Sequence, residues 1–328
     1  MCPLQLGSAD GIPNAIGVGG EGEGDERVIK GGSVVPRNTL ALWGRGSPIF
    51  KTFFWDGKVD FANGKSKSQF GSELPSDDPL IVTIHLPVVE IREMLAEDKF
   101  VGSQKKEKVT AAEKIYAAVV DRLKNDHKTE TIDLAGLRQK SVGELGYIDV
   151  AISIKEFFKR KFAVKPHKFN EFVFNNKTLK KGELEGAALF YGKGKCGLCH
   201  SGPLFSDLNF YTIPFRQLGS GKNGFGVDYG RFNVTHNPSD LYKFRTPPLL
   251  NVSKTAPYGH SGSIGTPKEA IFLHFDPLRR LETASLSSHD RIELFKRIAS
   301  SSQALHSIAT LDEEEVENLA HFLKTLDF

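Results

Sequence analysis

The stretch YGKGKCGLCHSGPLF, from Tyr191 to Phe205, contains two of the three cysteines of the 328-residue chain, with a histidine directly after the second. These residues are Cys196, Cys199 and His200. Two thiols two residues apart, followed at once by an imidazole, are typical of covalent haem attachment, in which the sulfurs bind the porphyrin edge and the histidine binds the iron. The sequence therefore predicts one haem c, attached through Cys196 and Cys199 with His200 as an axial ligand.

Three other interpretations of the cysteine pair are open. A redox dithiol needs a βαβ surrounding, and the residues after His200 show no such pattern. A zinc site needs further ligands at short spacing, and neither a second cysteine pair nor a suitable histidine pair is present. Two buried cysteines beside an unrelated surface histidine are the plainest alternative. Covalent haem attachment is the interpretation that the spacing favours.

The composition is that of a globular protein. Hydrophobic residues make up 39% of the chain and charged residues 25%. The 43 Lys and Arg are mixed with 40 Asp and Glu, so no basic face predicts binding to nucleic acid. No apolar run reaches the roughly 18 residues of a membrane span. Three cysteines cannot build a disulfide framework for a chain of this size.

Length and periodicity predict a mostly α fold with two domains. The first domain is expected over residues 1–165 and the second over 166–328, joined within a looser stretch at 164–178. Long irregular loops rich in glycine and proline are expected over 201–268, and a further glycine-rich loop over 17–32.

Four segments have the three- and four-residue spacing of apolar side chains that indicates a helix. The predicted helices begin near Thr110, at Tyr147, at Lys180 and after Thr310. Thr110 with Glu113, and Thr310 with Glu313, match the pattern of a capping box. The last helix is expected to bury a stripe made by Val316, Leu319 and Leu323.

The second axial ligand of the predicted haem is expected not to be sulfur. The chain has two methionines, Met1 and Met94, and both lie in the first predicted domain. A bis-histidine haem would have a lower potential than a histidine–methionine haem, which suits passing electrons to an oxidising site. The residue pattern leaves seven candidates open: His236, His260, His274, His289, His306, His321 and Tyr258.

Longer stretches of the chain resemble the bacterial di-haem cytochrome c peroxidase and MauG-like family. In the second half these are LFYGKGKCGLCHSGPLFSD, FRTPPLLNVSKTAPYGHSGSIGTPKEAI and LDEEEVENLAHFLKTL. In the first half they are LGSADGIPNAIGVGG, VPRNTLAL, FFWDGKVD and LPVVEIREML, in the order of the family. The resemblance implies two cytochrome c-like domains and a peroxidase-type oxidoreductase. Electrons enter such an enzyme at the C-terminal haem and reduce hydrogen peroxide at an N-terminal haem.

The resemblance also implies catalytic roles for two residues of the first half. Trp55 matches a tryptophan that lies between the two haems and can serve as a stepping point for electrons. Glu90 matches a distal acid that takes a proton from bound peroxide and returns it to the leaving oxygen.

Five further residues are implied to bind haem or a cation. His274 falls at the sixth ligand of the C-terminal haem, where the peroxidases have Met and MauG has Tyr. Arg245 is expected to hold a haem propionate by a fork of hydrogen bonds. Calcium is a candidate ion at Asn38, with the main-chain carbonyl groups of Thr255 and Pro257 as its other ligands.

The start of the chain departs from the family. The family's first C-x-x-C-H motif lies just ahead of the segment that LGSADG matches, and this chain begins at Met1 and Cys2. We favour a shortened product of a longer frame, whose full-length form would hold a second haem. The alternatives are a mono-haem electron-transfer protein that has lost peroxidase activity and a haem-anchored binding or sensor module.

The family resemblance implies partners and a location. The expected reductant is a small electron-donor protein, either a cytochrome c or a cupredoxin, and the expected oxidant is hydrogen peroxide. A second copy of the chain is a candidate partner, which would make a homodimer. The periplasm is the expected compartment, because haem c is attached outside the cytoplasmic membrane of bacteria.

Overall fold

The computed structural model describes residues 14–17, 19, 30–71, 74–90, 93–94, 105–126, 129–279 and 286–328. The predictions about the first two residues, and most of the predicted loop over 17–32, lie outside the described residues.

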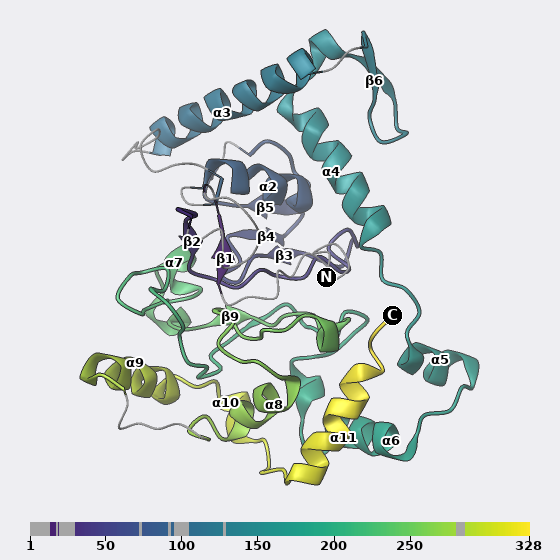
Figure 1. The fold of residues 1–328 in the computed structure, drawn as a ribbon, viewed down its shortest axis with the longest axis vertical. Helices are drawn as coiled ribbons and strands as arrows, with labels where there is room; N and C mark the ends of the chain where they lie inside the picture. The colour runs from purple at the N-terminus through teal and green to yellow at the C-terminus, as the bar shows by residue number, and fades with distance from the viewer. Residues whose placement is uncertain are drawn as a thin grey trace.

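Helices dominate the described parts of the chain, as expected, and the strands are short (Figure 1). The helices are α2 (Pro79–His85), α3 (Lys105–Asp126), α4 (Tyr147–Lys161), α5 (Lys168–Asn175), α6 (Lys181–Tyr191), α7 (Phe232–Thr235), α8 (Pro267–Phe275), α9 (Ser288–Ala299), α10 (Gln303–His306) and α11 (Glu313–Lys324). The strands are β1 (Ala15–Ile16), β2 (Val34–Val35), β3 (Thr52–Phe53), β4 (Val59–Ala62), β5 (Lys65–Lys67), β6 (Thr131–Asp133), β7 (Gln139–Ser141), β8 (Phe210–Tyr211) and β9 (Phe244–Arg245). Among the helices of these parts, none combines the length and the apolar composition that crossing a bilayer requires.

The two halves of the chain occupy different parts of the molecule and share a core. In Figure 1 the first half gathers around α2, α3 and α4, the second half gathers around α6, α8 and α11, and β9 lies where the halves meet. A single cluster of buried apolar side chains nevertheless includes residues from both halves. Examples are Phe50, Phe53 and Val59 from the first half and Phe190, Phe205 and Phe322 from the second. Burial of apolar surface therefore stabilises the contact between the halves.

Helix α11 has a capping box, but not at the predicted residues. The Asp312 carboxylate accepts a hydrogen bond from the Glu315 backbone N–H at 2.8 Å, and Glu315 Oε2 accepts one from the Asp312 N–H at 3.0 Å. The predicted box of Thr310 with Glu313 was wrong, because the aspartate two residues later caps the helix. The predicted stripe of Val316, Leu319 and Leu323 is buried, as expected.

Two other predictions of local structure were wrong. Helix α3 begins at Lys105, so Thr110 lies inside the helix and does not cap it. The stretch 164–178, predicted as loose, contains helix α5. Its N-cap is His167, whose Nδ1 accepts a hydrogen bond from the Asn170 N–H at 3.3 Å. Histidine is not among the usual capping residues, so no start signal for this helix is visible in the sequence.

A glycine lets helices α6 and α11 cross at close range. A Cβ atom at Gly186 would lie 1.9 Å from the carbonyl oxygen of Asn318 on α11. Beside the crossing, the rings of Phe190 and Phe322 lie 4.9 Å apart. Because α6 leads directly into the cysteine motif, this crossing also fixes the position of that motif.

The segment after strand β3 packs against the second half. Gly57 has φ +66°, and a Cβ atom there would lie 2.2 Å from Arg231 Nη1 and 2.4 Å from the ring of Phe210 on β8. Arg231 Nη1 donates hydrogen bonds to the carbonyl oxygens of Asp56 at 3.1 Å and Gly57 at 3.0 Å. These contacts hold the adjacent Trp55 at the junction of the two halves.

Candidate haem site

The cysteine motif forms one tight turn just after helix α6. The 3-10 helix η3 spans Cys196–Leu198, and the His200 backbone N–H donates to the Cys196 carbonyl oxygen at 2.8 Å. Neither Cys196 nor Cys199 is in a disulfide. The turn brings both sulfurs and the imidazole of His200 to the wall of one cavity.

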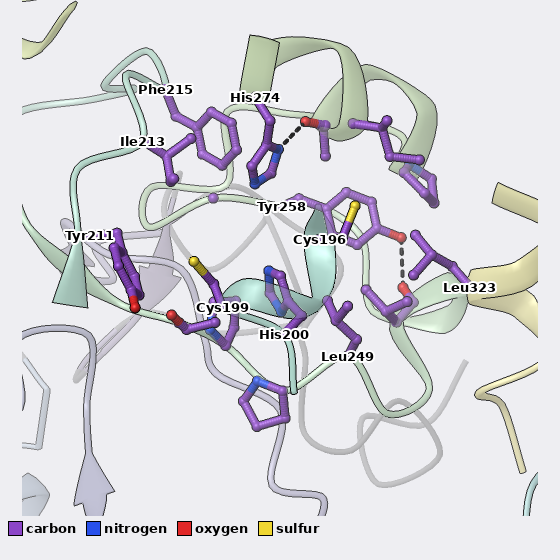
Figure 2. A pocket seen from close by; sticks show the side chains of 18 of the residues that line it. Cys196, Cys199, His200, Tyr211, Ile213, Phe215, Leu249, Tyr258, His274 and Leu323 are labelled. Carbon is purple, nitrogen blue, oxygen red and sulfur yellow. Dashed lines mark hydrogen bonds between the residues drawn. The ribbon is translucent and has the colours of Figure 1, made fainter. Parts of the chain in front are cut away.

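This cavity, which we call the motif cavity, has a volume of about 240 Å³ and mostly apolar walls. Figure 2 shows His200 and His274 on opposite sides of it, with the two cysteine sulfurs at its edge. Other lining residues include Ile213, Phe215, Leu249, Tyr258 and Leu323. An apolar cavity with a few converging polar groups suits a large flat cofactor. The structure thus brings the predicted sixth ligand, His274, to the predicted motif.

Both histidines are held by main-chain carbonyl groups. Nδ1 of His200 lies 3.0 Å from the carbonyl oxygen of Phe205, and Nδ1 of His274 lies 2.7 Å from that of Ala270. A carbonyl oxygen can only accept, so each Nδ1 carries the proton and each Nε2 keeps its lone pair for a metal. Burial lowers the pKa of His200 to about 4 and also lowers the pKa of His274. Both imidazoles are therefore neutral at neutral pH, as iron ligands must be.

Two of the other candidate ligands also line the motif cavity, but their polar groups are engaged. His260 Nε2 lies 2.8 Å from Oε1 of Gln217, and its ring stacks on Phe244 at 3.9 Å. The Tyr258 hydroxyl donates to the Val252 carbonyl oxygen at 2.7 Å. The remaining four candidates are exposed and do not line the cavity: His236, His289, His306 and His321.

The thiols of the motif are not activated. Burial raises the pKa of Cys196 to about 12 and also raises the pKa of Cys199. Catalytic dithiols have thiolates stabilised by positive neighbours and hence lowered pKa values. These surroundings disfavour the redox-dithiol interpretation.

Arg245 has an unused hydrogen-bond donor. Its side chain is 1% exposed, Nε donates to the Phe54 carbonyl oxygen at 3.0 Å, and Nη1 donates to that of Thr246 at 3.1 Å. Nη2 is buried and has no hydrogen-bond partner within the described parts of the chain. Burial, together with the positive charge of Arg45, lowers the pKa of Arg245 to about 9. A buried cation with a free donor on the cavity wall fits a carboxylate such as a haem propionate.

Trp55 lines the same cavity and is tied to the residues of the predicted calcium site. Its Nε1 donates to the Asn38 carbonyl oxygen at 2.8 Å. The Asn38 amide nitrogen donates to the Pro257 carbonyl oxygen at 2.7 Å, and Thr255 also lines the cavity. A calcium ion would need the side-chain oxygen of Asn38, and not its nitrogen, to face the Pro257 carbonyl oxygen. Rotating the Asn38 amide by half a turn supplies that oxygen. The calcium site stays a prediction.

Glu90 lies outside the motif cavity, in an ion pair. Its Oε1 is 2.9 Å from Lys58 Nζ and accepts a further hydrogen bond from Gln69 Nε2 at 3.3 Å. Lys58 Nζ also lies 4.4 Å from the centre of the Phe54 ring. Burial alone would raise the pKa of Glu90, but Lys58 outweighs it and lowers that pKa. Glu90 is therefore a carboxylate at neutral pH.

The sequence analysis missed Glu93, one turn further along. Its backbone N–H donates to the Glu90 carbonyl oxygen at 3.2 Å. Burial raises the pKa of Glu93; Lys58 opposes this shift and the charge of Glu90 adds to it. Two neighbouring carboxyl groups whose pKa values are pushed apart are the usual arrangement of an acid–base pair. The three-residue spacing of Glu90 and Glu93 was the signal available in the sequence.

A buried ionic network joins the two halves near these residues. Arg37 Nε lies 2.7 Å from Oδ2 of Asp228, and Arg37 Nη1 lies 2.6 Å from Oδ2 of Asp56. Lys222 Nζ lies 3.1 Å from the same Asp56 oxygen. Burial alone would raise the pKa of Asp56 and of Asp228, but the charge of Arg37 outweighs it and lowers both.

Comparison with known proteins gives distant relatives of one kind. No protein-family model matches the chain. A cytochrome-c peroxidase, IdrP1, of Pseudomonas sp. (strain SCT) is 29% identical over 180 residues, which cover 44% of this chain and 48% of that protein. The cytochrome c551 peroxidase of Nitrosomonas europaea is 34% identical over 105 residues, which cover 32% of this chain and 30% of that protein. The chain thus spans about half the length, or less, of these curated relatives.

Solved structures with the same fold cover nearly the whole chain. A MauG-like protein associated with microbial copper homeostasis aligns with a TM-score of 0.66 and 22% identity, over 99% of this chain and 82% of that chain. The di-haem peroxidase BthA of Burkholderia thailandensis aligns with a TM-score of 0.55 and 18% identity, over 100% of this chain and 77% of that chain. The relatives found by sequence make the chain a distant homologue of the di-haem cytochrome c peroxidase and MauG-like family, and the solved structures show that it has the same fold.

Proposed function

We propose that the chain holds one covalent haem c, attached at Cys196 and Cys199, with His200 and His274 as its two axial ligands. The observation that carries this proposal is the pair of neutral imidazoles facing each other across the motif cavity, each with Nδ1 committed to a main-chain carbonyl group. Each protonated thiol adds its sulfur and its hydrogen across a vinyl group of the haem. A carbon–sulfur bond forms in each case, with no net oxidation.

The proposed role of this haem is to accept single electrons from a donor and pass them on. When bound, the haem supplies the one-electron couple. The chain's own residues set the conditions: the apolar walls exclude water, and the two imidazoles favour a lower potential than a histidine–methionine pair would. Trp55, which lines the cavity at the junction of the halves, is proposed to relay electrons toward the first half.

The first half, residues 1–165, is proposed as the peroxidatic domain of a di-haem oxidoreductase, and residues 166–328 as the electron-accepting domain, each cytochrome c-like. Two electrons and two protons convert one hydrogen peroxide into two waters. Glu93 is proposed to carry the protons, because burial and the charge of Glu90 raise its pKa and so favour its protonated form. Glu90, paired with Lys58, would hold the negative charge beside it.

The proposed partners follow from the family. Relatives of this chain include cytochrome c551 peroxidases, so a small cytochrome c is the first candidate for the electron donor and a cupredoxin the second. A calcium ion at Asn38, Thr255 and Pro257 and a homodimeric assembly remain parts of the proposal. The proposed location is the periplasm, where haem c is attached.

The test is the haem content of protein matured in a bacterium that makes c-type cytochromes. We expect one haem for each chain of 328 residues, retained after denaturation, with low-spin spectra in both oxidation states. Colourless protein whose two motif thiols react with alkylating reagents would contradict the proposal.

A second candidate function is a mono-haem electron carrier built on the same scaffold. It is favoured by the cysteine count, since the chain's three cysteines complete a single C-x-x-C-H motif. Peroxide turnover separates the two functions. Two haems with peroxide turnover would support the enzyme, whereas one haem with reversible reduction and no turnover would support the carrier.

A further inference from the structure

The wall of the motif cavity has unused hydrogen-bond donors beyond Arg245. Among the residues that the structure describes, three buried N–H groups in this region have no partner: Trp43 Nε1, Arg45 Nη2 and Arg245 Nη2. Trp43 and Arg45 had no part in the sequence prediction. Buried donors without an acceptor are rare in folded proteins because each loses its hydration without replacement. Three of them together indicate an acceptor group that binds there.

Two of the three donors belong to residues that line the motif cavity, and the third belongs to a residue beside them. Trp43 and Arg245 line it. Arg45 Nε donates to the carbonyl oxygen of Ala41 at 3.0 Å, and Ala41 also lines the cavity. The guanidinium carbons of Arg45 and Arg245 lie 5.9 Å and 5.3 Å from the centre of the same ring, that of Phe50. The segment 41–45 of the first half therefore supplies two unused donors, on Trp43 and Arg45, near the unused donor of Arg245 in the second half.

The charge of this group is uncompensated within the part of the chain that the structure describes. There, neither Arg45 nor Arg245 has an ion pair with a carboxylate, in contrast to Arg37, which has two. Burial lowers the pKa of Arg45 to about 10 and, with the Arg45 charge, that of Arg245 to about 9. Two buried cations without partners are strongly unfavourable. A ligand with two carboxylates would neutralise both.

The donors are also rigidly positioned. The Trp43 ring packs edge-to-face against Phe162 at 5.5 Å and against Phe328 at 5.0 Å. The next residue, Gly44, has φ +75°, and a Cβ atom there would lie 2.7 Å from the Leu204 side chain. Fixed donors of this kind bind an anion without having to reorganise.

On the basis of the haem proposed above, we propose that Trp43, Arg45 and Arg245 form a cradle that binds the two propionate groups of the haem. Trp43 and Arg45 act as positioning residues supplied by the first half of the chain. The cradle links the haem of the second half to the first half through charge as well as packing. It also raises the reduction potential of that haem, because nearby cations disfavour the more positive ferric state.

The test compares variants of the haem-loaded chain by resonance Raman spectroscopy and redox titration. Trp43→Phe keeps an aromatic ring and removes only the N–H, so the propionate bending band should shift with a small fall in potential. Arg45→Met removes a charge, so the same band should shift with a larger fall in potential. Arg45→Lys should restore most of the potential, because it restores the charge. Arg122→Met, on the exposed pair of α3, is the matched control and should change neither signal.

Each outcome decides between named alternatives. Unchanged propionate bands and potentials in both Trp43→Phe and Arg45→Met would overturn the cradle, and would indicate that a free dicarboxylate or another anion occupies these donors. If Arg45→Met does not fold, Trp43→Phe alone decides through the Raman band. A parent protein without attached haem would instead contradict the proposed function, so the two failures are distinguishable.

Discussion

The motif cavity and the Lys58–Glu90–Glu93 cluster bury polar side chains in opposite ways. In the cavity, His200 and His274 each donate a hydrogen bond from Nδ1–H to a main-chain carbonyl group, and both imidazoles are neutral. In the cluster, Lys58 and Glu90 remain charged, as an ion pair at 2.9 Å. Neutral imidazoles with a free lone pair suit a metal, whereas a charged pair beside a second acid suits proton transfer.

The difference comes from the partners available at each place. Burial disfavours every charge, and around His200 that effect lowers the pKa to about 4. Lys58 is also buried, which alone would lower its pKa, but Glu90 and Glu93 raise it above the ordinary value. One fold therefore holds a candidate haem site and a candidate site for proton transfer.

The contrast between the motif cavity and the Lys58–Glu90–Glu93 cluster requires that haem is covalently attached at the cavity, which is the first prediction. Replacing both Cys196 and Cys199 with Ser should abolish covalent haem, because no other cysteine pair in the chain has this spacing. Haem that stays with the protein after denaturation and gel electrophoresis measures the effect. Retention of covalent haem by the double variant would show that the motif is not the attachment site.

The second prediction concerns His274, which should be the sixth ligand. His274→Gly should leave the haem attached and convert its spectrum from low spin to high spin, because one strong axial ligand is lost. Electron paramagnetic resonance of the ferric protein measures this change. His306→Ala, at an exposed histidine, should leave the spectrum low spin. If the His274→Gly protein stayed low spin, another group would be the sixth ligand, and His274 would not be the partner of His200.

The third prediction separates the two acids of the cluster. In protein that turns over peroxide, Glu93→Gln should lower the turnover rate by about 10³-fold, within the usual range for loss of a general acid–base group. Glu90→Gln should have a smaller effect, since Lys58 lowers the pKa of Glu90 and Glu93 is the residue proposed to carry the proton. Steady-state rates with a reduced cytochrome c measure both. Equal losses would show that the acids act as one unit, and a loss in Glu90→Gln alone would reverse their roles.

The same contrast explains how much could be predicted from sequence. Cys196, Cys199 and His200 are adjacent in the chain and form one turn, so their spacing alone indicates their chemistry. The family resemblance supplied His274 and Trp55, which the structure places at the same cavity. It could not supply contacts particular to this chain.

Contacts between segments far apart in the chain could not be predicted from the sequence. Arg37 and Asp228 lie 191 residues apart and form a two-bond ion pair. The unused donors of Trp43 and Arg45 depend on how the segment packs against the second half, because any acceptor within reach would have satisfied them. Local spacing carries no information on either contact.

The fourth prediction uses that ion pair, and its expected effect is the smallest. Asp228→Asn should lower the free energy of unfolding by about 3 kcal/mol at pH 7, because it removes one partner of a buried ion pair. Urea unfolding followed by tryptophan fluorescence measures the change. Asp126→Asn, in the exposed pair with Arg122, is the control and should cost less than about 0.5 kcal/mol.

The pH dependence of this effect has a definite sign. Arg37 lowers the pKa of Asp228 in the folded state, so the stabilisation is complete above the unfolded pKa of about 3.9 and is lost as the pH falls through the folded pKa. The parent should therefore lose stability below about pH 4 more steeply than Asp228→Asn, by up to about 1.4 kcal/mol per pH unit. Identical acid slopes would mean that Asp228 titrates alike in both states. The charged contact between the halves would then be a surface-like pair, and the shared apolar core would be the main contribution to holding them together.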